Sequence, residues 1–160
     1  MDVVLVQMAQ IGMAERGSRL KTTLGSCVGV VLHDQVRGLS GLAHIMLPER
    51  LRGDESVGKY ADTAIPTLLS LLEQRGSRRR DLRAYLAGGA NMFQSSQDSR
   101  IATVGEKNLL AVRQILGSLG IPIEREHTGG EQGRTVLFDA HTGELEVKTL
   151  QRIPWKGSRN

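Results

Sequence analysis

The chain has 160 residues, 39% of them hydrophobic and 24% charged, which is typical of one folded domain and excludes a disordered or fibrous protein. Its 21 basic and 17 acidic residues give a formal net charge of +4, which favours an acidic partner such as a nucleic acid, an anionic membrane surface or a Glu-rich protein. One cysteine cannot form an internal disulfide, and no apolar run approaches the ~20 residues of a membrane span. The first residues are acidic, whereas a signal peptide begins with basic residues. We therefore expect a cytoplasmic protein without membrane insertion.

In the first half of the chain, short apolar and β-branched runs predict four strands, at residues 3–6, 19–24, 28–32 and 39–47. The last two are separated by residues 34–38, whose composition is typical of a turn, so they are expected to form an antiparallel hairpin. Pro48 then ends the second strand of this hairpin.

Two helices are predicted in the rest of the chain. Residues 60–74 keep a helical period of apolar side chains, although Pro66 requires that the helix either kinks there or begins near Thr63. The clearer helix covers residues 105–119 and ends at Gly120. Further strands are predicted at residues 82–87, 121–126, 135–138 and 144–150.

This order of elements predicts an α/β protein, a single-domain layered sandwich of mixed, largely antiparallel β-sheet with two main helices. We expect the domain to cover residues 1–154 and to be followed by a loose tail at residues 155–160. Among 19 glycines, none matches a Walker loop or a dinucleotide-binding fingerprint, which argues against a doubly wound nucleotide fold. Two glycine pairs, at residues 88–89 and 129–130, are expected to serve tight backbone geometry near the site or simple turns.

Cys27 is the only thiol in the chain. A lone cysteine is more often a buried core residue than a nucleophile. Here, however, Gly25-Ser26-Cys27 forms a turn that leads into a strand. This placement leaves backbone N–H groups beside the sulfur, where they can stabilise a thiolate and later an oxyanion.

His44 is the candidate base for that thiol, although a histidine among apolar neighbours is in isolation more often a core residue. If the hairpin pairs symmetrically about its turn, residues 27 and 44 are cross-strand neighbours with Cβ atoms about 4.5–5.5 Å apart. A register change of one residue would place them on opposite faces. The other three histidines show no metal-ligand spacing, so we expect neither a metal nor another cofactor.

A basic run at Arg78, Arg79 and Arg80, flanked by Arg75 and Arg83, is either a solvated loop or a docking surface for an acidic partner. The five aromatic residues are too scattered to form a stacking platform for single strands. We therefore expect no nucleic-acid partner.

Two segments, residues 22–30 (TTLGSCVGV) and 41–48 (GLAHIMLP), resemble the CheD family, the chemoreceptor glutamine deamidases of bacterial chemotaxis. Further blocks of the resemblance follow in order at residues 59–62, 88–93, 105–108, 129–130 and 133–134. The resemblance covers roughly residues 18–150 and is far more specific than a lone cysteine and histidine.

The resemblance implies a protein-glutamine glutaminase, an amide hydrolase with a cysteine nucleophile and no cofactor. It assigns the nucleophile to Cys27, the base to His44 and the third member to Thr22, with Thr23 as a second candidate hydroxyl. The N–H groups of Ser26 and Cys27 would hold the oxyanion.

The implied substrates are methyl-accepting chemotaxis receptors, and the implied partner is a CheC-type phosphatase. Hydrolysis of glutamyl methyl esters by the same site, and association with receptor arrays, are further expectations from the resemblance. The alternative is a non-catalytic chemotaxis regulator that acts by binding receptors or the phosphatase.

Overall fold

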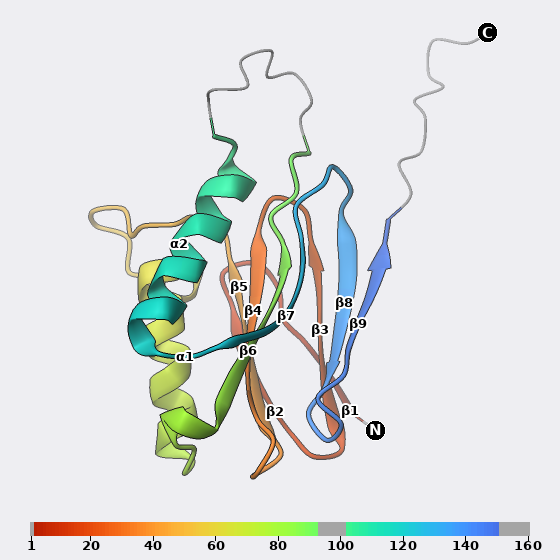
Figure 1. The fold of residues 1–160 in the computed structure, drawn as a ribbon. Helices are drawn as coiled ribbons and strands as arrows, with labels where there is room; N and C mark the ends of the chain where they lie inside the picture. Colours follow the sequence, from red (N-terminus) through yellow and green to blue (C-terminus); the bar gives the residue numbers. More distant parts are fainter. Residues whose placement is uncertain (1, 93–101, 151–160) are drawn as a thin grey trace, which may run out of the picture.

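The structure is a computed structural model that describes residues 2–92 and 102–150. These residues form three layers: two helices, a five-stranded sheet and a four-stranded sheet (Figure 1). The strands are β1 (Asp2–Leu5), β2 (Ile11–Glu15), β3 (Ser18–Leu24), β4 (Val28–Asp34), β5 (Leu39–Ile45), β6 (Leu82–Gly88), β7 (Ile123–Thr128), β8 (Arg134–Asp139) and β9 (Leu145–Thr149). The helices are α1 (Ala61–Gln74) and α2 (Val104–Leu119), with short 3₁₀ helices η1 (Val57–Lys59) and η2 (Arg79–Asp81). The expected α/β layered sandwich is confirmed, whereas the expected tail lies outside the described residues.

The five-stranded sheet, in the order β2-β5-β4-β6-β7, forms the middle layer and is covered on both faces (Figure 1). In β4, Val28, Val30 and Leu32 pack in one core with the two helices. Val31 points the other way and packs in a second core with the four-stranded sheet, whose order is β1-β3-β8-β9. Burial on both faces explains why the central strands have continuous apolar sequences.

Helix α1 begins at Ala61, so the alternative in which Pro66 moved its start to Thr63 is wrong. Pro66 lies inside the helix but on its exposed face, where the carbonyl that loses its N–H donor lies near solvent. On the opposite face, the apolar stripe that includes Leu68 and Leu72 is fully buried. Packing of this stripe therefore outweighs the local cost of the proline.

Strand β2 was not among the predicted elements. It pairs antiparallel with β5 at the edge of the middle sheet and contains Gly12. A Cβ atom on Gly12 would lie 2.5 Å from Cγ2 of Val6, so only glycine allows the chain to pass this close. The glycine that permits this packing also breaks the apolar pattern by which a strand is predicted.

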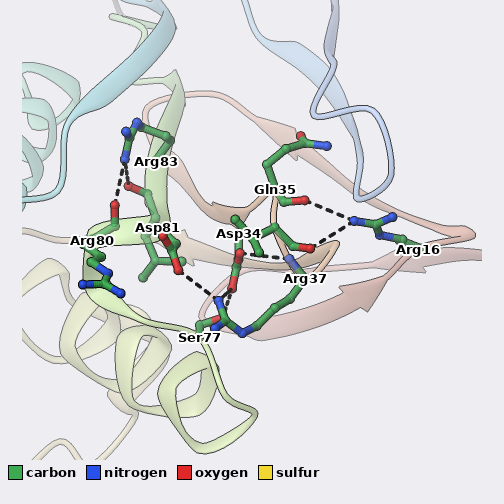
Figure 2. Close-up of polar contacts among 10 residues, drawn as sticks. Arg16, Asp34, Gln35, Arg37, Ser77, Arg80, Asp81 and Arg83 are labelled. Carbon is green, nitrogen blue, oxygen red and sulfur yellow. Dashed lines mark hydrogen bonds and ion pairs between the residues drawn. The ribbon is translucent and has the colours of Figure 1, made fainter.

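At the far end of β4 from Cys27, a buried carboxylate joins three segments of the chain (Figure 2). Asp34 accepts hydrogen bonds from Ser77 Oγ at 2.7 Å and from Arg37 Nη1 at 3.0 Å. The same Arg37 atom donates to Asp81 at 3.0 Å. Burial alone would raise the pKa of Asp34, but the hydrogen bonds from Ser77 and Arg37 outweigh it and hold the pKa below its usual value.

Asp34→Ala is expected to lower the free energy of unfolding by about 2–4 kcal/mol at neutral pH, because it leaves the buried Ser77 hydroxyl without its acceptor. The lowered pKa means that this stabilisation is present above the usual pKa of a carboxyl group and disappears as the pH falls through the lower folded value. Urea denaturation at several pH values measures both effects. Asp81→Ala is the control, since it removes the more exposed partner of Arg37 and should cost at most about 1 kcal/mol.

Candidate active site

Cys27 ends a short bend, residues 25–27, that leads directly into β4, and its side chain is half-buried. The bend is fixed to the end of β6 by two backbone hydrogen bonds, from Gly89 N to Cys27 O at 2.9 Å and from Ala90 N to Gly25 O at 3.0 Å. Within residues 2–92 and 102–150, neither the N–H of Ser26 nor that of Cys27 donates to a protein acceptor. Two adjacent donors beside the thiol therefore have no acceptor among the described residues.

Of the two glycine pairs, Gly88–Gly89 lies against this bend, so for this pair backbone geometry near the site, one of the two expected roles, is confirmed. All four residues have positive φ, with values of 101° at Gly88, 69° at Gly89, 83° at Gly129 and 72° at Gly130. A Cβ atom on Gly88 would overlap the Cys27 carbonyl oxygen. Gly129 N in turn donates to Gly88 O at 2.9 Å, so the second pair supports the first.

His44 lies near the end of β5, antiparallel to β4, on the face that points to the four-stranded sheet. The expected symmetric register, with residue 44 opposite Cys27, is wrong by two residues, since His44 pairs with Gly29. The hairpin closes at the pair Asp34–Leu39, which shifts every later pair. A shift of two residues leaves Cys27 and His44 on the same face of the sheet. Cys27 is therefore the diagonal neighbour of His44, at a typical Cα separation of about 7–8 Å.

Gly29 provides the space in which the next contact forms. Its absent Cβ atom would lie 3.1 Å from a methyl carbon of Leu24 and 3.7 Å from Cγ2 of Thr22, both in β3 of the other sheet. Thr22 Oγ1 lies 2.7 Å from His44 Nδ1 and donates a hydrogen bond to the Val6 carbonyl at 2.6 Å. The two sheets thus meet at a threonine–histidine pair.

Thr22 and Thr23 differ clearly in placement. Thr22 is fully buried against His44, whereas Thr23 is exposed on the other face of β3 and contacts Thr135 Oγ1 at 3.1 Å. The Val6 carbonyl was not predicted as part of the site, and no side-chain pattern could have revealed it, because it is a backbone group.

These contacts determine which ring nitrogen of His44 carries a proton. The single proton of the Thr22 hydroxyl goes to the Val6 carbonyl, so Thr22 Oγ1 can only accept from His44 Nδ1. Neutral His44 is therefore protonated at Nδ1 and has a free lone pair at Nε2. Burial lowers the pKa of His44, partly offset by a hydrogen bond with Val6, and burial raises the pKa of the Cys27 thiol. Both shifts favour a neutral base beside a protonated thiol.

A groove of about 550 Å³ opens beside the Thr22–His44 pair. Its lining consists of Leu5, Val6, Gln7, Met8, Thr22, Thr23 and His44. Residues Leu5 and Met8 are 58% and 61% exposed, which is unusual for large apolar residues at one place. A partner that contacts His44 from this side would bury them.

The basic run lies elsewhere. Arg78, Arg79 and Arg80 are exposed around η2, which precedes β6, and the start of β6 pairs with Asp34 at the end of β4. The seven residues of β4 therefore separate this run from Cys27 by about 20 Å. Its role in docking an acidic partner stays a prediction.

Residues 2–92 and 102–150 lack two further features. They contain no group of three or more His, Cys, Asp or Glu side chains suited to a metal ion. They also contain no helix with the length and apolar character required to cross a membrane.

Comparison with known proteins gives consistent similarities. A family model described as CheD chemotactic sensory transduction matches residues 46–149. The chain is 43% identical over 155 residues to the chemoreceptor glutamine deamidase CheD of Halalkalibacterium halodurans, covering 94% of this chain and 96% of that protein. It is 38% identical over 155 residues to the protein of the same name from Bacillus licheniformis, covering 94% and 92%. A solved Neisseria meningitidis structure of the DUF152 family is only 13% identical, with a TM-score of 0.47 over 82% of this chain and 64% of that one.

Proposed function

The chain belongs to the CheD family, and from this we propose that it is a protein-glutamine deamidase that converts glutamine side chains of chemotaxis receptors to glutamate and releases ammonia. Relatives at about 40% identity along nearly the whole chain, named chemoreceptor glutamine deamidases, support this activity. The structural observation that carries the proposal is the buried contact between Thr22 and His44, on the face of the sheet that Cys27 shares.

The proposed reaction uses Cys27 as nucleophile and His44 as base. Nε2 of His44 takes the thiol proton, and the sulfur attacks the carboxamide carbon. The oxyanion is held by the N–H groups of Ser26 and Cys27. His44 then gives its proton to the departing ammonia, which leaves a thioester. Water, deprotonated by the again neutral His44, cleaves the thioester and restores the thiol, with glutamate as the product.

In this mechanism Thr22 positions the base by accepting from Nδ1. Thr22→Val should lower kcat/KM by about 10–100-fold, because His44 then spends part of its time with the proton on Nε2, where it cannot act as a base. Thr22→Ser should restore most of the activity. Thr23→Val is the comparison and should lower kcat/KM by less than Thr22→Val does, since Thr23 lines the groove but its hydroxyl bonds Thr135 rather than His44. Equal losses in Thr22→Val and Thr23→Val would contradict the role of Thr22.

The pH profile tests the protonation states. Because burial lowers its pKa, His44 loses its proton at lower pH than free imidazole and is already a base there. The acid limb of kcat/KM should therefore be centred below pH 6.5, with a plateau through neutrality that ends only where the thiol ionises. An acid limb centred above pH 7 would contradict a neutral, desolvated His44.

The groove beside His44 offers a binding place for the residues that flank the target glutamine. Leu5 and Met8 would cover apolar side chains of the receptor segment, which places the reacting carboxamide toward His44 and Cys27. On the family resemblance we extend the proposal to glutamyl methyl esters, which would lose methanol at the same site, to a CheC-type phosphatase partner and to association with receptor arrays.

The proposed function is tested by incubating the protein with a receptor cytoplasmic fragment. We expect ammonia release and, in mass spectra of digested fragment, deamidation at a few specific glutamines. Binding of the fragment without either product would overturn the enzyme and leave the non-catalytic regulator as the function.

A further inference from the structure

Asn108, on the first turns of α2, is a polar residue that is completely buried and that the proposed mechanism does not use. Its side-chain Nδ2 donates to the backbone carbonyl of Ser26 at 3.2 Å and to that of Met46 at 3.0 Å. Its Oδ1 is buried without a hydrogen-bond partner within the described chain. An unpaired buried acceptor destabilises the fold, so Oδ1 does not explain why an amide lies here. The favourable contribution of the Asn108 side chain comes from the two hydrogen bonds that Nδ2 donates.

The two carbonyls belong to the two segments that carry the reacting groups. Ser26 precedes Cys27 in the bend, and Met46 follows His44 by two residues, directly after the end of β5. One rigid side chain on a helix therefore joins the bend of the nucleophile to the strand of the base. Helix α2 packs closely against the segment after β6, where a Cβ atom on Gly89 would collide with Leu109 and one on Gly105 with the Gly89 carbonyl.

The bond to Ser26 has a directional consequence. Peptide bonds in the described chain are trans, and in a trans peptide the C=O of one residue and the N–H of the next point in opposite directions. Because Asn108 holds the Ser26 carbonyl toward α2, the N–H of Cys27 must point away from α2. That N–H has no acceptor among the described residues and is one of the two donors proposed for the oxyanion.

We propose that Asn108 is a positioning residue that fixes the Ser26–Cys27 peptide, so that the Cys27 N–H is aimed at the oxyanion formed from the substrate carboxamide. This rests on the proposed deamidase function. Asn108 touches neither the substrate nor the reacting atoms; it acts through the peptide plane. Its loss should leave the thiol reactive while weakening stabilisation of the tetrahedral intermediate.

The test uses Asn108→Ala and Asn108→Leu, the second of which keeps nearly the original volume. Both should lower kcat for ammonia release from a receptor fragment by about 10–100-fold, with KM changed by less than about threefold. This loss is smaller than the about 10²–10³-fold expected when an oxyanion donor is removed completely. The rate at which iodoacetamide alkylates Cys27 should stay within about threefold, because that displacement forms no oxyanion. Cys27 is the only thiol, so the alkylation signal is unambiguous.

Val112→Ala is the matched control, since Val112 lies one turn further along α2 and is also fully buried. It should reduce stability without this loss of kcat when all proteins are assayed well below their melting temperatures. A kcat within threefold of wild type in either Asn108 variant would overturn the inference. So would a parallel loss of alkylation and turnover, which would mean that the thiol itself had moved. If wild type releases no ammonia, the proposed function fails instead, and the two failures are thereby distinguished.

Discussion

Cys27→Ala is expected to lower kcat for ammonia release from a receptor fragment by about 10⁴-fold or more, because no other side chain of the chain can supply a thiolate. Cys27→Ser should be similarly inactive, since a hydroxyl is a far weaker acid than a thiol and His44 with a lowered pKa is a weak base. A coupled ammonia assay and mass spectrometry of the fragment measure this loss.

The accompanying variants show whether Cys27 and His44 act as one unit. His44→Ala should lose about as much activity as Cys27→Ala, and the double variant little more, because residues that act together are not additive. Fragment binding should survive in Cys27→Ala, since the thiol contributes little surface. Undiminished ammonia release by Cys27→Ala would mean that this protein is not a cysteine deamidase.

Gly88→Ala is expected to have the largest effect on stability, lowering the free energy of unfolding by about 3–5 kcal/mol. A side chain there is strained at φ of 101°, and its Cβ atom would overlap the Cys27 carbonyl oxygen, a backbone atom that cannot rotate away. Relief requires that the bend at residues 25–27 move, so activity should fall even under conditions where the variant is folded. Urea denaturation and kcat measured below the transition report the two effects.

Gly120→Ala measures the cost of backbone strain at positive φ without the steric overlap that a Cβ atom on Gly88 would cause. Gly120 ends α2 with φ of 71°, and nothing lies within 4 Å of its absent Cβ atom. This variant should cost only about 1–2 kcal/mol, the price of a left-handed conformation, and leave kcat unchanged. Equal destabilisation by Gly88→Ala and Gly120→Ala would show that contact with the Cys27 bend is not what makes Gly88 necessary.

The sequence was sufficient for the layered α/β fold and for most of its strands, because these depend on local patterns. The residues between Asp34 and Leu39 have turn chemistry, and the hairpin forms there. The register was not predictable, because it depends on which pair closes the loop. Asp34 Oδ1 accepts a hydrogen bond from the N–H of Arg37 inside the loop at 3.1 Å, and Asp34 pairs with Leu39 across the hairpin. This pairing places His44 opposite Gly29.

For the third member of the site, a signal was present in the sequence. Thr22 lies between Leu20 and Leu24 at a period of two, and both leucines are buried in the core between the sheets. That alternation turns Thr22 inward and Thr23 outward, and it could have decided between them. The contributions of Val6 and Asn108 had no such signal, because each acts on or through a backbone carbonyl.

The pair formed by Thr22 and His44 connects the two sheets by a buried hydrogen bond, in addition to the apolar contacts between them and the hydrogen bonds that Arg125 and Arg134 make between β7 and the four-stranded sheet. His44 lies in the five-stranded sheet and Cys27 directly before its strand β4, whereas Thr22 lies in the four-stranded sheet and the Val6 carbonyl in the segment that follows β1. A folding intermediate with only the first sheet formed would contain nucleophile and base but lack the contact that holds the base in its effective tautomer. Full catalytic competence would therefore require that both sheets be formed and packed together.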